Sequence, residues 1–180
     1  MILEIVKYGH PALRAKGRRI EAIDAEIRQL AEDMIDTMID ADGVGLAAQQ
    51  VGLPLQMCVV DVTGVSNRPS TMSIDGQPMD PEEHMPLILI NPEIEPFGKA
   101  RSAVEGCLSF PGVSTDITRT SSVRVQAQTL DGSVVFEASG LLARAIQHEH
   151  DHLQGIPFID RMEAEQRREL EQEIEAIRHA

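Results

Sequence analysis

The residues best suited to chemistry are two histidines and a glutamate within the stretch from Gln147 to Gly155. If this stretch is helical, His148 and His152 lie one turn apart on the same face, and both imidazoles can reach one metal ion. Glu149 then lies beside that ion, where its carboxylate can take a proton from bound water. The same His-Glu-x-x-His spacing arises by chance on solvated helices in roughly one of a few hundred chains of this length. A metal site therefore needs support from elsewhere in the sequence.

Cys107 is the strongest candidate for a third ligand. Catalytic metal sites generally use three protein donors and keep one position open for water. Cys107 stands in Gly-Cys-Leu-Ser-Phe-Pro-Gly, a context that hydrophobic periodicity does not explain. The alternative is a buried thiol with no ligand role, which is the preferred interpretation of Cys58 because that residue falls within an apolar strand pattern.

A stretch of small residues between Gly43 and Gly52 is also unusual. It holds three glycines and two alanines where most loops carry charge. Small residues let another backbone or a ligand approach closely. A tight helix-to-strand turn explains them equally well, whereas a phosphate loop is disfavoured because no Lys-Ser/Thr follows.

The elements that must position these residues can be predicted along the chain. Asp24 is a plausible N-cap for a helix that ends near Ala41, and the histidine helix is expected to start near Ser139 or Gly140 and to end at Gly155. A third helix is predicted over 162–179. Strands are predicted over 55–62, 87–91, either side of 96–99, 122–129 and 133–138, with Pro92 ending the second. Residues 64–86 lack periodicity and are expected to form a surface excursion.

Composition narrows the class of protein. With 180 residues, one domain is the default. The formal net charge of −13 argues against a nucleic-acid site, which needs a clustered basic surface. The sequence contains no signal-peptide core and no apolar run that approaches a membrane span, so a cytoplasmic protein is expected. Two cysteines in such a chain favour free thiols.

Taken together, three stretches resemble the signature motifs of the peptide deformylases. They read Gly43-x-Gly45-x-Ala47-Ala48-x-Gln50, Glu105-Gly106-Cys107-Leu108-Ser109 and His148-Glu149-x-Asp151-His152, in the order of that family. The resemblance implies a single α+β domain over 1–180, with mixed or antiparallel sheets packed around a central metal-binding helix and with N-terminal and C-terminal helices. It also implies a hydrolase that removes the formyl group from the N-terminal N-formylmethionine of new polypeptides and releases formate.

The resemblance further assigns roles at the site. Cys107, His148 and His152 would bind one divalent metal ion, with Fe(II) the native ion and zinc, nickel or cobalt also able to occupy the site. Water bound there would attack the formyl carbon with Glu149 as general acid and base. In the family, the side-chain amide at Gln50 and the backbone N–H at Leu108 donate to the formyl oxygen.

The substrate would lie extended between the first two motifs like an added strand. Gly45 and Gly106 would permit its close approach, and an apolar pocket would receive the methionine side chain. Arg144 is expected to snorkel at the pocket rim, where some relatives carry an aliphatic residue. The expected substrate-binding residues are Val44, Gly45, Glu105, Gly106, Leu141 and Arg144.

Asp151 is expected to orient the metal ligands, with Arg119 as its partner. The alternative for these two residues is an ordinary surface pair. The implied partners are N-formylmethionyl nascent peptides. A transient contact with the ribosome stays open, because the last helix is net acidic here, whereas a basic C-terminal helix serves some relatives in docking.

Two other functions compete with deformylation. One is a different metallohydrolase, such as a peptidase, built on the same helix, and Glu-Gly-Cys-Leu-Ser argues against it. The other is a non-catalytic metal-binding or ribosome-binding relative. The presence of Cys107, Glu149 and Gln50 together argues against that second alternative.

Overall fold

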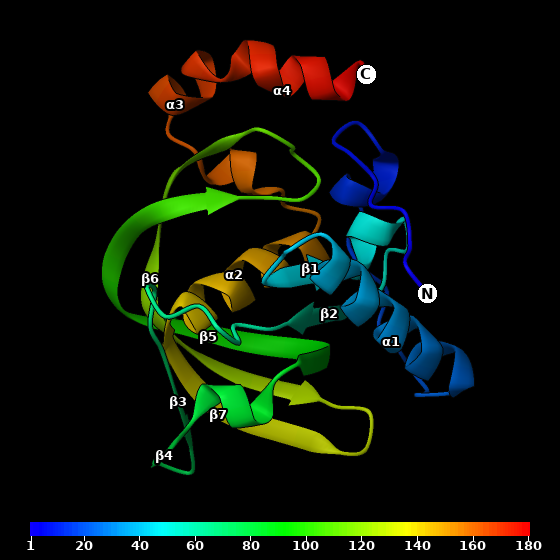
Figure 1. The fold of residues 1–180 in the computed structure, drawn as a ribbon, viewed down its shortest axis with the longest axis vertical. Helices are drawn as coiled ribbons and strands as arrows, with labels where there is room; N and C mark the ends of the chain where they lie inside the picture. The colour runs from blue at the N-terminus through cyan, green and yellow to red at the C-terminus, as the bar shows by residue number, and fades with distance from the viewer.

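A curved antiparallel sheet is the framework of the molecule, which a computed structural model describes over residues 1–180. Its seven strands follow the order β1-β2-β5-β6-β7-β3-β4. They are β1 (Gly45–Ala47), β2 (Met57–Val60), β3 (Ser70–Ile74), β4 (Gln77–Met79), β5 (Leu87–Gly106), β6 (Ser114–Gln128) and β7 (Ser133–Gly140). Figure 1 shows the sheet curling around the central helix α2 (Leu141–Leu153). The predicted α+β arrangement around the histidine helix is confirmed.

Helix α2 is buried along almost its whole length. Leu142, Ile146 and Leu153 pack into the largest apolar cluster, against residues of β2, β6 and β7. The helix begins after Gly140, at φ 70°, where a Cβ would run into the Pro69 carbonyl, and it is followed by Gly155 at φ 77°. The predicted boundaries are therefore correct, and the polar residues of α2 lie in an environment of low dielectric.

Helix α1 (Ala25–Asp40) packs beside β1 and β2. As predicted, Asp24 caps it by accepting a hydrogen bond from the Ile27 N–H at 3.0 Å. Met34 and Met38 are fully buried in a second apolar cluster with residues of β1 and β2. The helix thus supports β1, which forms part of the small-residue stretch.

The C-terminal segment forms two helices where one was predicted. These are α3 (Ala164–Glu169) and α4 (Glu171–Arg178), and the helix is interrupted at Leu170, whose φ is −101° and ψ 3°. Ile174 is fully buried in a third cluster with Tyr8, Phe110 and Phe158. This cluster attaches α4 to the N-terminal arm, and Figure 1 shows the two lying across the same end of the molecule.

Strand β5 contradicts the prediction that Pro92 ends a strand and that residues 96–99 interrupt another. It runs unbroken from Leu87 to Gly106. Its pairing with β6 shifts register between Ile90 and Glu93 and again between Phe97 and Ala100. Such irregularities accommodate prolines and glycines without ending a strand.

Residues 64–86 lie largely at the surface, as predicted, but they are not without regular structure. They contain β3 and β4, and β3 pairs with β7 from Ser70 opposite Gly140 to Ser73 opposite Glu137. Met72 of β3 is buried in the largest apolar cluster. Short 3-10 helices complete the chain at Pro11–Arg14, Ala48–Val51, Pro81–His84 and Phe158–Arg161.

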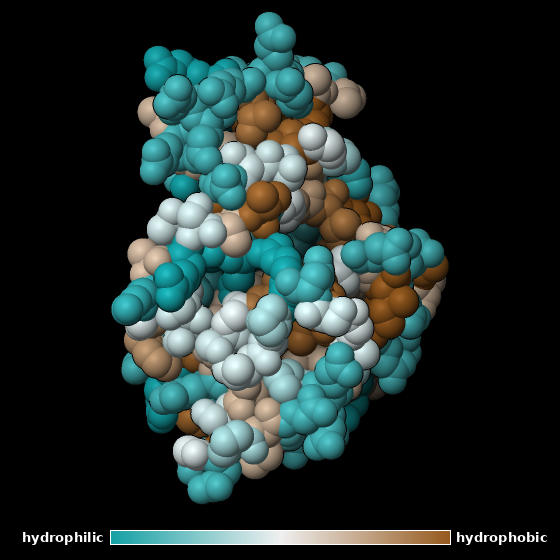
Figure 2. Space-filling model, turned by 60° about the vertical axis from the view of Figure 1, so that its left-hand side comes forward, coloured by the Kyte–Doolittle hydropathy of each residue, from teal (hydrophilic) through white to brown (hydrophobic).

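Polar residues cover much of the surface. The face drawn in Figure 2 is mostly hydrophilic, and it is hollowed near its middle. None of the helices combines the length and the apolar content that crossing a bilayer requires.

Candidate metal centre

Three predicted ligands meet in one place. Cys107, which follows β5, and His148 and His152 of α2 each offer one ligand atom, and these atoms all lie within 4.8 Å of one another. Cys107 Sγ is 3.3 Å from His152 Nε2. Burial lowers the pKa of His152 well below its usual value, which keeps this imidazole neutral and able to coordinate. One thiolate and two imidazoles form a donor set that fits a single divalent transition metal ion and leaves a fourth position open.

Glu105 orients the first histidine. One of its carboxylate oxygens lies 2.8 Å from His148 Nδ1, which leaves His148 Nε2 free for the metal. Burial alone would raise the pKa of the Glu105 carboxyl, but hydrogen bonds from His148 and Arg119 hold it well below its ordinary range. Glu105 was expected to bind substrate. It does line the cavity at this site, yet both of its oxygens are already engaged by neighbouring side chains.

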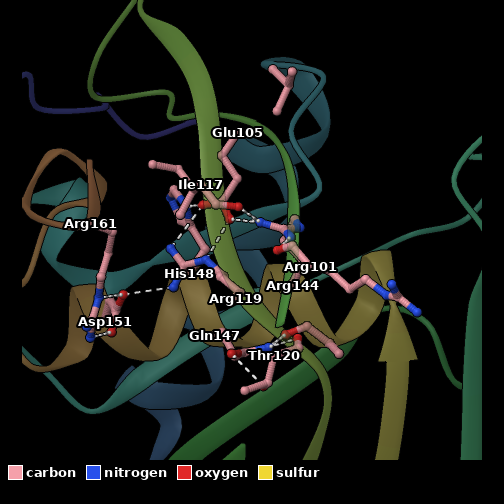
Figure 3. A network of polar contacts seen from close by, with 12 residues as sticks. Arg101, Glu105, Ile117, Arg119, Thr120, Arg144, Gln147, His148, Asp151 and Arg161 are labelled. Carbon is pink, nitrogen blue, oxygen red and sulfur yellow. Dashed lines mark hydrogen bonds and ion pairs between the residues drawn. The ribbon is translucent and has the colours of Figure 1, made fainter. Parts of the chain in front are cut away.

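Arg119 and Asp151 form the pair that was predicted, and it is buried, unlike an ordinary surface pair. Arg119 Nη1 donates to Asp151 at 2.9 Å, while its Nε and Nη2 donate to Glu105. Arg161, which the sequence did not single out, donates twice to the same Asp151 carboxylate at 2.9 and 3.0 Å. Figure 3 shows Arg161 and Asp151 side by side along α2. These contacts connect the C-terminal end of the metal-binding helix to β5 and β6.

Arg144 corrects a prediction. Its side chain does not snorkel at the rim but is buried, with 7% of the residue exposed. The guanidinium donates to Glu105 at 2.7 Å and to the carbonyls of Ile117 and Arg101 at 2.8 Å each. We call the linked residues Glu105, Arg119, Arg144, Asp151 and Arg161 the ion-pair network (Figure 3).

Glu149 is buried beside the ligands, with 3% of the residue exposed. Its Oε1 has no hydrogen-bond partner. Burial raises the pKa of its carboxyl to about 7, against the opposing effect of His148. Burying a carboxylate oxygen without a hydrogen-bond partner destabilises the folded protein. Its presence in the cavity wall therefore indicates that Glu149 has a functional role.

Two glycines at the site have different structural reasons. A Cβ on Gly45 would collide with Oε2 of Glu149 and lie 2.8 Å from its Cδ, so this glycine makes room for the carboxylate. A Cβ on Gly106 would meet nothing closer than the Val113 carbonyl at 3.6 Å. Packing within the protein therefore requires a glycine at 45 but not at 106.

Hydrogen-bond donors also converge here. The Gln50 Oε1 accepts the Ala47 N–H at 3.0 Å, which fixes the amide so that its Nε2 lies 3.5 Å from Cys107 Sγ and 3.3 Å from Ser109 Oγ. The backbone N–H of Leu108 has no acceptor within the chain. Both predicted oxyanion donors thus lie beside the ligand cluster. The Gln50 amide is fixed through its oxygen, and the Leu108 N–H is free to donate.

A cavity of about 550 Å³ opens next to the ligands. Its walls include all the residues that were predicted to bind substrate: Val44, Gly45, Glu105, Gly106, Leu141 and Arg144. Several further wall residues, among them Asp42, Arg68 and Val104, were not identified from the sequence. No local pattern marks Arg68, because it reaches the cavity only through the pairing of β3 with β7.

Comparisons with known proteins identify the same family that the sequence motifs resemble. Residues 2–168 match the family model described as polypeptide deformylase. A peptide deformylase of Methylacidiphilum infernorum is 49% identical over 179 residues, covering 99% of this chain and 94% of that protein. One from Opitutus terrae is 43% identical, covering 98% of this chain and 93% of that protein.

A solved structure extends the agreement to the fold. The peptide deformylase 1B of Arabidopsis thaliana, determined with an inhibitor, is 37% identical and superimposes with a TM-score of 0.83, covering 97% of this chain and 90% of that one. The motifs, the ligand cluster and the fold point to the same assignment. The chain belongs to the polypeptide deformylase family, and it removes the N-formyl group from formylated nascent peptides.

Proposed function

We propose that Glu149 carries the proton and that Gln50 and Leu108 bind the formyl oxygen when this chain releases formate from an N-formylmethionyl peptide. The single observation that carries the proposal is a buried carboxylate with an unpartnered oxygen in the same cavity as a thiolate and two imidazoles. A protein that only stored a metal ion would have no use for a costly unpartnered carboxylate at that position.

Cys107, His148 and His152 are the residues that would hold the metal ion. When bound there, a divalent ion supplies Lewis acidity, which lowers the pKa of water and polarises the formyl oxygen. The donor set suits zinc as well as iron, nickel or cobalt. We propose Fe(II) as the native ion because of the family resemblance. Metal analysis of protein purified without air tests this, and zinc in that preparation would contradict it.

Glu149 is suited to move a proton in both directions. A carboxyl with a pKa of about 7 binds and releases a proton with similar ease at neutral pH. A bound cation would lower that pKa and favour the carboxylate as the starting form. The carboxylate then accepts a proton from water as the water attacks the formyl carbon, and it delivers the proton to the amine nitrogen that leaves.

The oxyanion donors act without moving. The Gln50 amide is held at its oxygen end by the Ala47 N–H, so its Nε2 needs no reorganisation as charge develops on the formyl oxygen. The Leu108 N–H, next to Cys107 in the chain, supplies a second donor. Fixed donors of this kind stabilise the transition state more than the ground state.

The remaining cavity would position the peptide. Val44 and Leu141 offer apolar surface for the methionine side chain, and Gly106 leaves space for the peptide backbone. Asp151 and Arg119 act at a distance, because they stabilise Glu105 and α2 and do not themselves contact the substrate. They are positioning residues in this proposal.

Formate release tests the function directly. Metal-loaded protein is incubated with a formyl-Met tripeptide, the matching acetyl-Met tripeptide and an unmodified peptide. We expect formate from the first and no cleavage of either control. Cleavage of internal peptide bonds regardless of the formyl group would instead favour a peptidase.

Contact with the ribosome is a separate proposal. Helix α4 carries Glu171, Glu173 and Glu175 but only one arginine, Arg178. A helix with this excess of negative charge gains little from contact with a phosphate backbone. We expect any ribosome contact to be transient and not to depend on α4. Co-sedimentation with ribosomes that disappears when α4 alone is charge-reversed would contradict this.

A further inference from the structure

We propose that Arg68 selects formylated chains that carry an acidic side chain at their third residue. The inference rests on the proposed function, since it names a preference among the substrates of the same cavity. Arg68 lies in the 64–86 segment, two residues before strand β3. The segment brings Arg68 to the wall of the cavity that also holds Cys107 and Glu149.

Arg68 is the one cation of the cavity wall that has no carboxylate partner. The other wall arginine, Arg144, is bonded to Glu105 in the ion-pair network. Arg68 forms no ion pair, and its Nη1 donates only to the carbonyl of Val104 at 3.1 Å. The single unpaired acid at the rim is Asp42, on the loop that follows α1. In a chain with a formal net charge of −13, an uncompensated guanidinium at a substrate cavity is a specific binding element for an anion.

The backbone next to Arg68 is fixed by the metal-binding helix. The Pro69 carbonyl accepts the Leu141 N–H at 3.1 Å, and the Ser70 hydroxyl accepts the Leu142 N–H at 2.9 Å. Both donors belong to the first turn of α2, whose N–H groups have no partners within the helix. Arg68 is therefore presented from a held position, which reduces the entropy lost when its guanidinium binds a ligand.

The register of β5 indicates which substrate residue reaches Arg68. β5 pairs with β6 as far as Gly106 but with β2 only over residues 87–90, so its end carries no strand on the second edge. Val104 and Gly106 both line the cavity, and backbone groups recur on one edge of a strand every two residues. A peptide added there, with its first residue beside Gly106, places its third residue beside Val104.

Side-chain alternation gives the same result. Successive side chains of an extended chain point to opposite faces, so the first and third residues share a face. If the methionine side chain enters the cavity, the third side chain points into it as well, and the second and fourth do not. An aspartate or glutamate at the third position thus meets the Arg68 guanidinium.

A peptide series tests the preference. The ratio kcat/KM is measured for formyl-Met-Ala-Xaa peptides in which Xaa is Glu, Gln or Lys, with the metal-loaded protein. A partly exposed charge pair is worth up to about 1 kcal/mol, so we expect Glu to exceed Gln by about threefold to fivefold. Lys should be the slowest of the three. The difference should lie in KM, and it should shrink at high salt because the pair is screened.

Variants assign the preference to the charge of Arg68. Arg68→Gln keeps a donor for the Val104 carbonyl and removes the charge, so Glu and Gln peptides should become equal. Arg68→Glu should invert the order and favour Lys. Arg168→Gln, an exposed arginine of α3 outside the cavity, is the matched control and should keep the parent preference.

Three results would overturn the inference. These are equal rates for Glu, Gln and Lys in the parent protein, an acidic preference that survives Arg68→Gln, and faster cleavage of formyl-Met-Glu-Ala than of formyl-Met-Ala-Glu. Absence of formate from every peptide would instead contradict the proposed function. Formate release with no dependence on the third residue would contradict only the role of Arg68.

Discussion

The buried end of the cavity at α2 and its rim at Arg68 differ in how their charges are neutralised. At the buried end, Glu105 binds two arginines and a histidine, and its side chain is only 5% exposed. At the rim, Arg68 donates a hydrogen bond to a backbone carbonyl and forms no ion pair with a carboxylate. The paired Glu105 carboxylate holds His148 in one geometry, whereas an unpaired charge at the rim is available to each incoming chain. We therefore expect substitutions at the buried end to change kcat or metal binding, and substitution of Arg68 at the rim to change the preference among substrates.

Glu149 should show the largest effect, because it stands at the buried end yet lacks a partner. Glu149→Gln keeps the shape and removes the base, and we expect kcat for formate release to fall by about 10² to 10⁴. Metal content, measured on the same samples, should not change. Glu169→Gln, exposed on α3, is the control. A variant that loses its metal together with its activity would show that Glu149 is structural.

Gln50 should follow. Gln50→Ala removes a fixed donor to the formyl oxygen, and loss of one such donor elsewhere costs about 10² to 10³ in kcat. KM should change little, because the donor acts mainly on the transition state. Steady-state kinetics on a formyl-Met peptide separate the two constants. A rise in KM at constant kcat would mean that the amide binds the ground state.

Glu105 tests whether the paired interior serves the metal. Glu105→Gln weakens the hold on His148 Nδ1 and leaves Arg119 and Arg144 without their shared carboxylate. We expect the affinity for metal to fall by about 10-fold to 100-fold, which competition with a chelator measures. The free energy of unfolding should fall as well, by about 3 kcal/mol.

Arg161→Ala is the contrasting variant for the same network, since the Arg161 side chain is 47% exposed. Exposed pairs contribute about 1 kcal/mol at most, so its stability in urea should be close to that of the parent. Equal losses of stability in the two variants would contradict the distinction between buried and exposed pairs.

Gly45 and Gly106 should have smaller effects on turnover than Glu149 or Gln50, and each should change a different kinetic constant. Gly45→Ala pushes against the Glu149 carboxylate, and we expect kcat to fall by about tenfold, because small misplacements of a reacting group are costly. Gly106→Ala meets no close neighbour in the protein and should raise KM instead. Measuring kcat and KM for both variants under the same conditions tests these two expectations. A higher KM in Gly45→Ala with kcat intact would return that glycine to a substrate-binding role.

Much of the site was predictable because its signals are local. The spacing of His148 and His152 fixes their common face on a helix, and Gly155 marks where that helix ends. Cys107 stood out because no periodic pattern accounts for it. Such features depend on a few neighbouring residues, so the sequence alone indicates them.

The rest depends on contacts between residues distant in sequence. Arg144 looked like a rim residue because nothing near it reveals Glu105, 39 positions earlier, as its buried partner. Strand β3 was missed because its pairing with β7 is set by the sheet and not by its own weak periodicity. Strand β5 passes Pro92 because the pairing with β6 shifts register there. Tertiary context overrides local preference in each case.

A crystal structure of the metal-loaded protein with a formyl-Met-Ala-Glu peptide, trapped by Glu149→Gln, would test the central claim most directly. We predict the formyl oxygen within about 3 Å of Gln50 Nε2 and of the Leu108 backbone nitrogen, with residue 149 beside the amide nitrogen that leaves. A formyl oxygen bound away from both donors, or a peptide that does not run along the free edge of β5, would contradict the account.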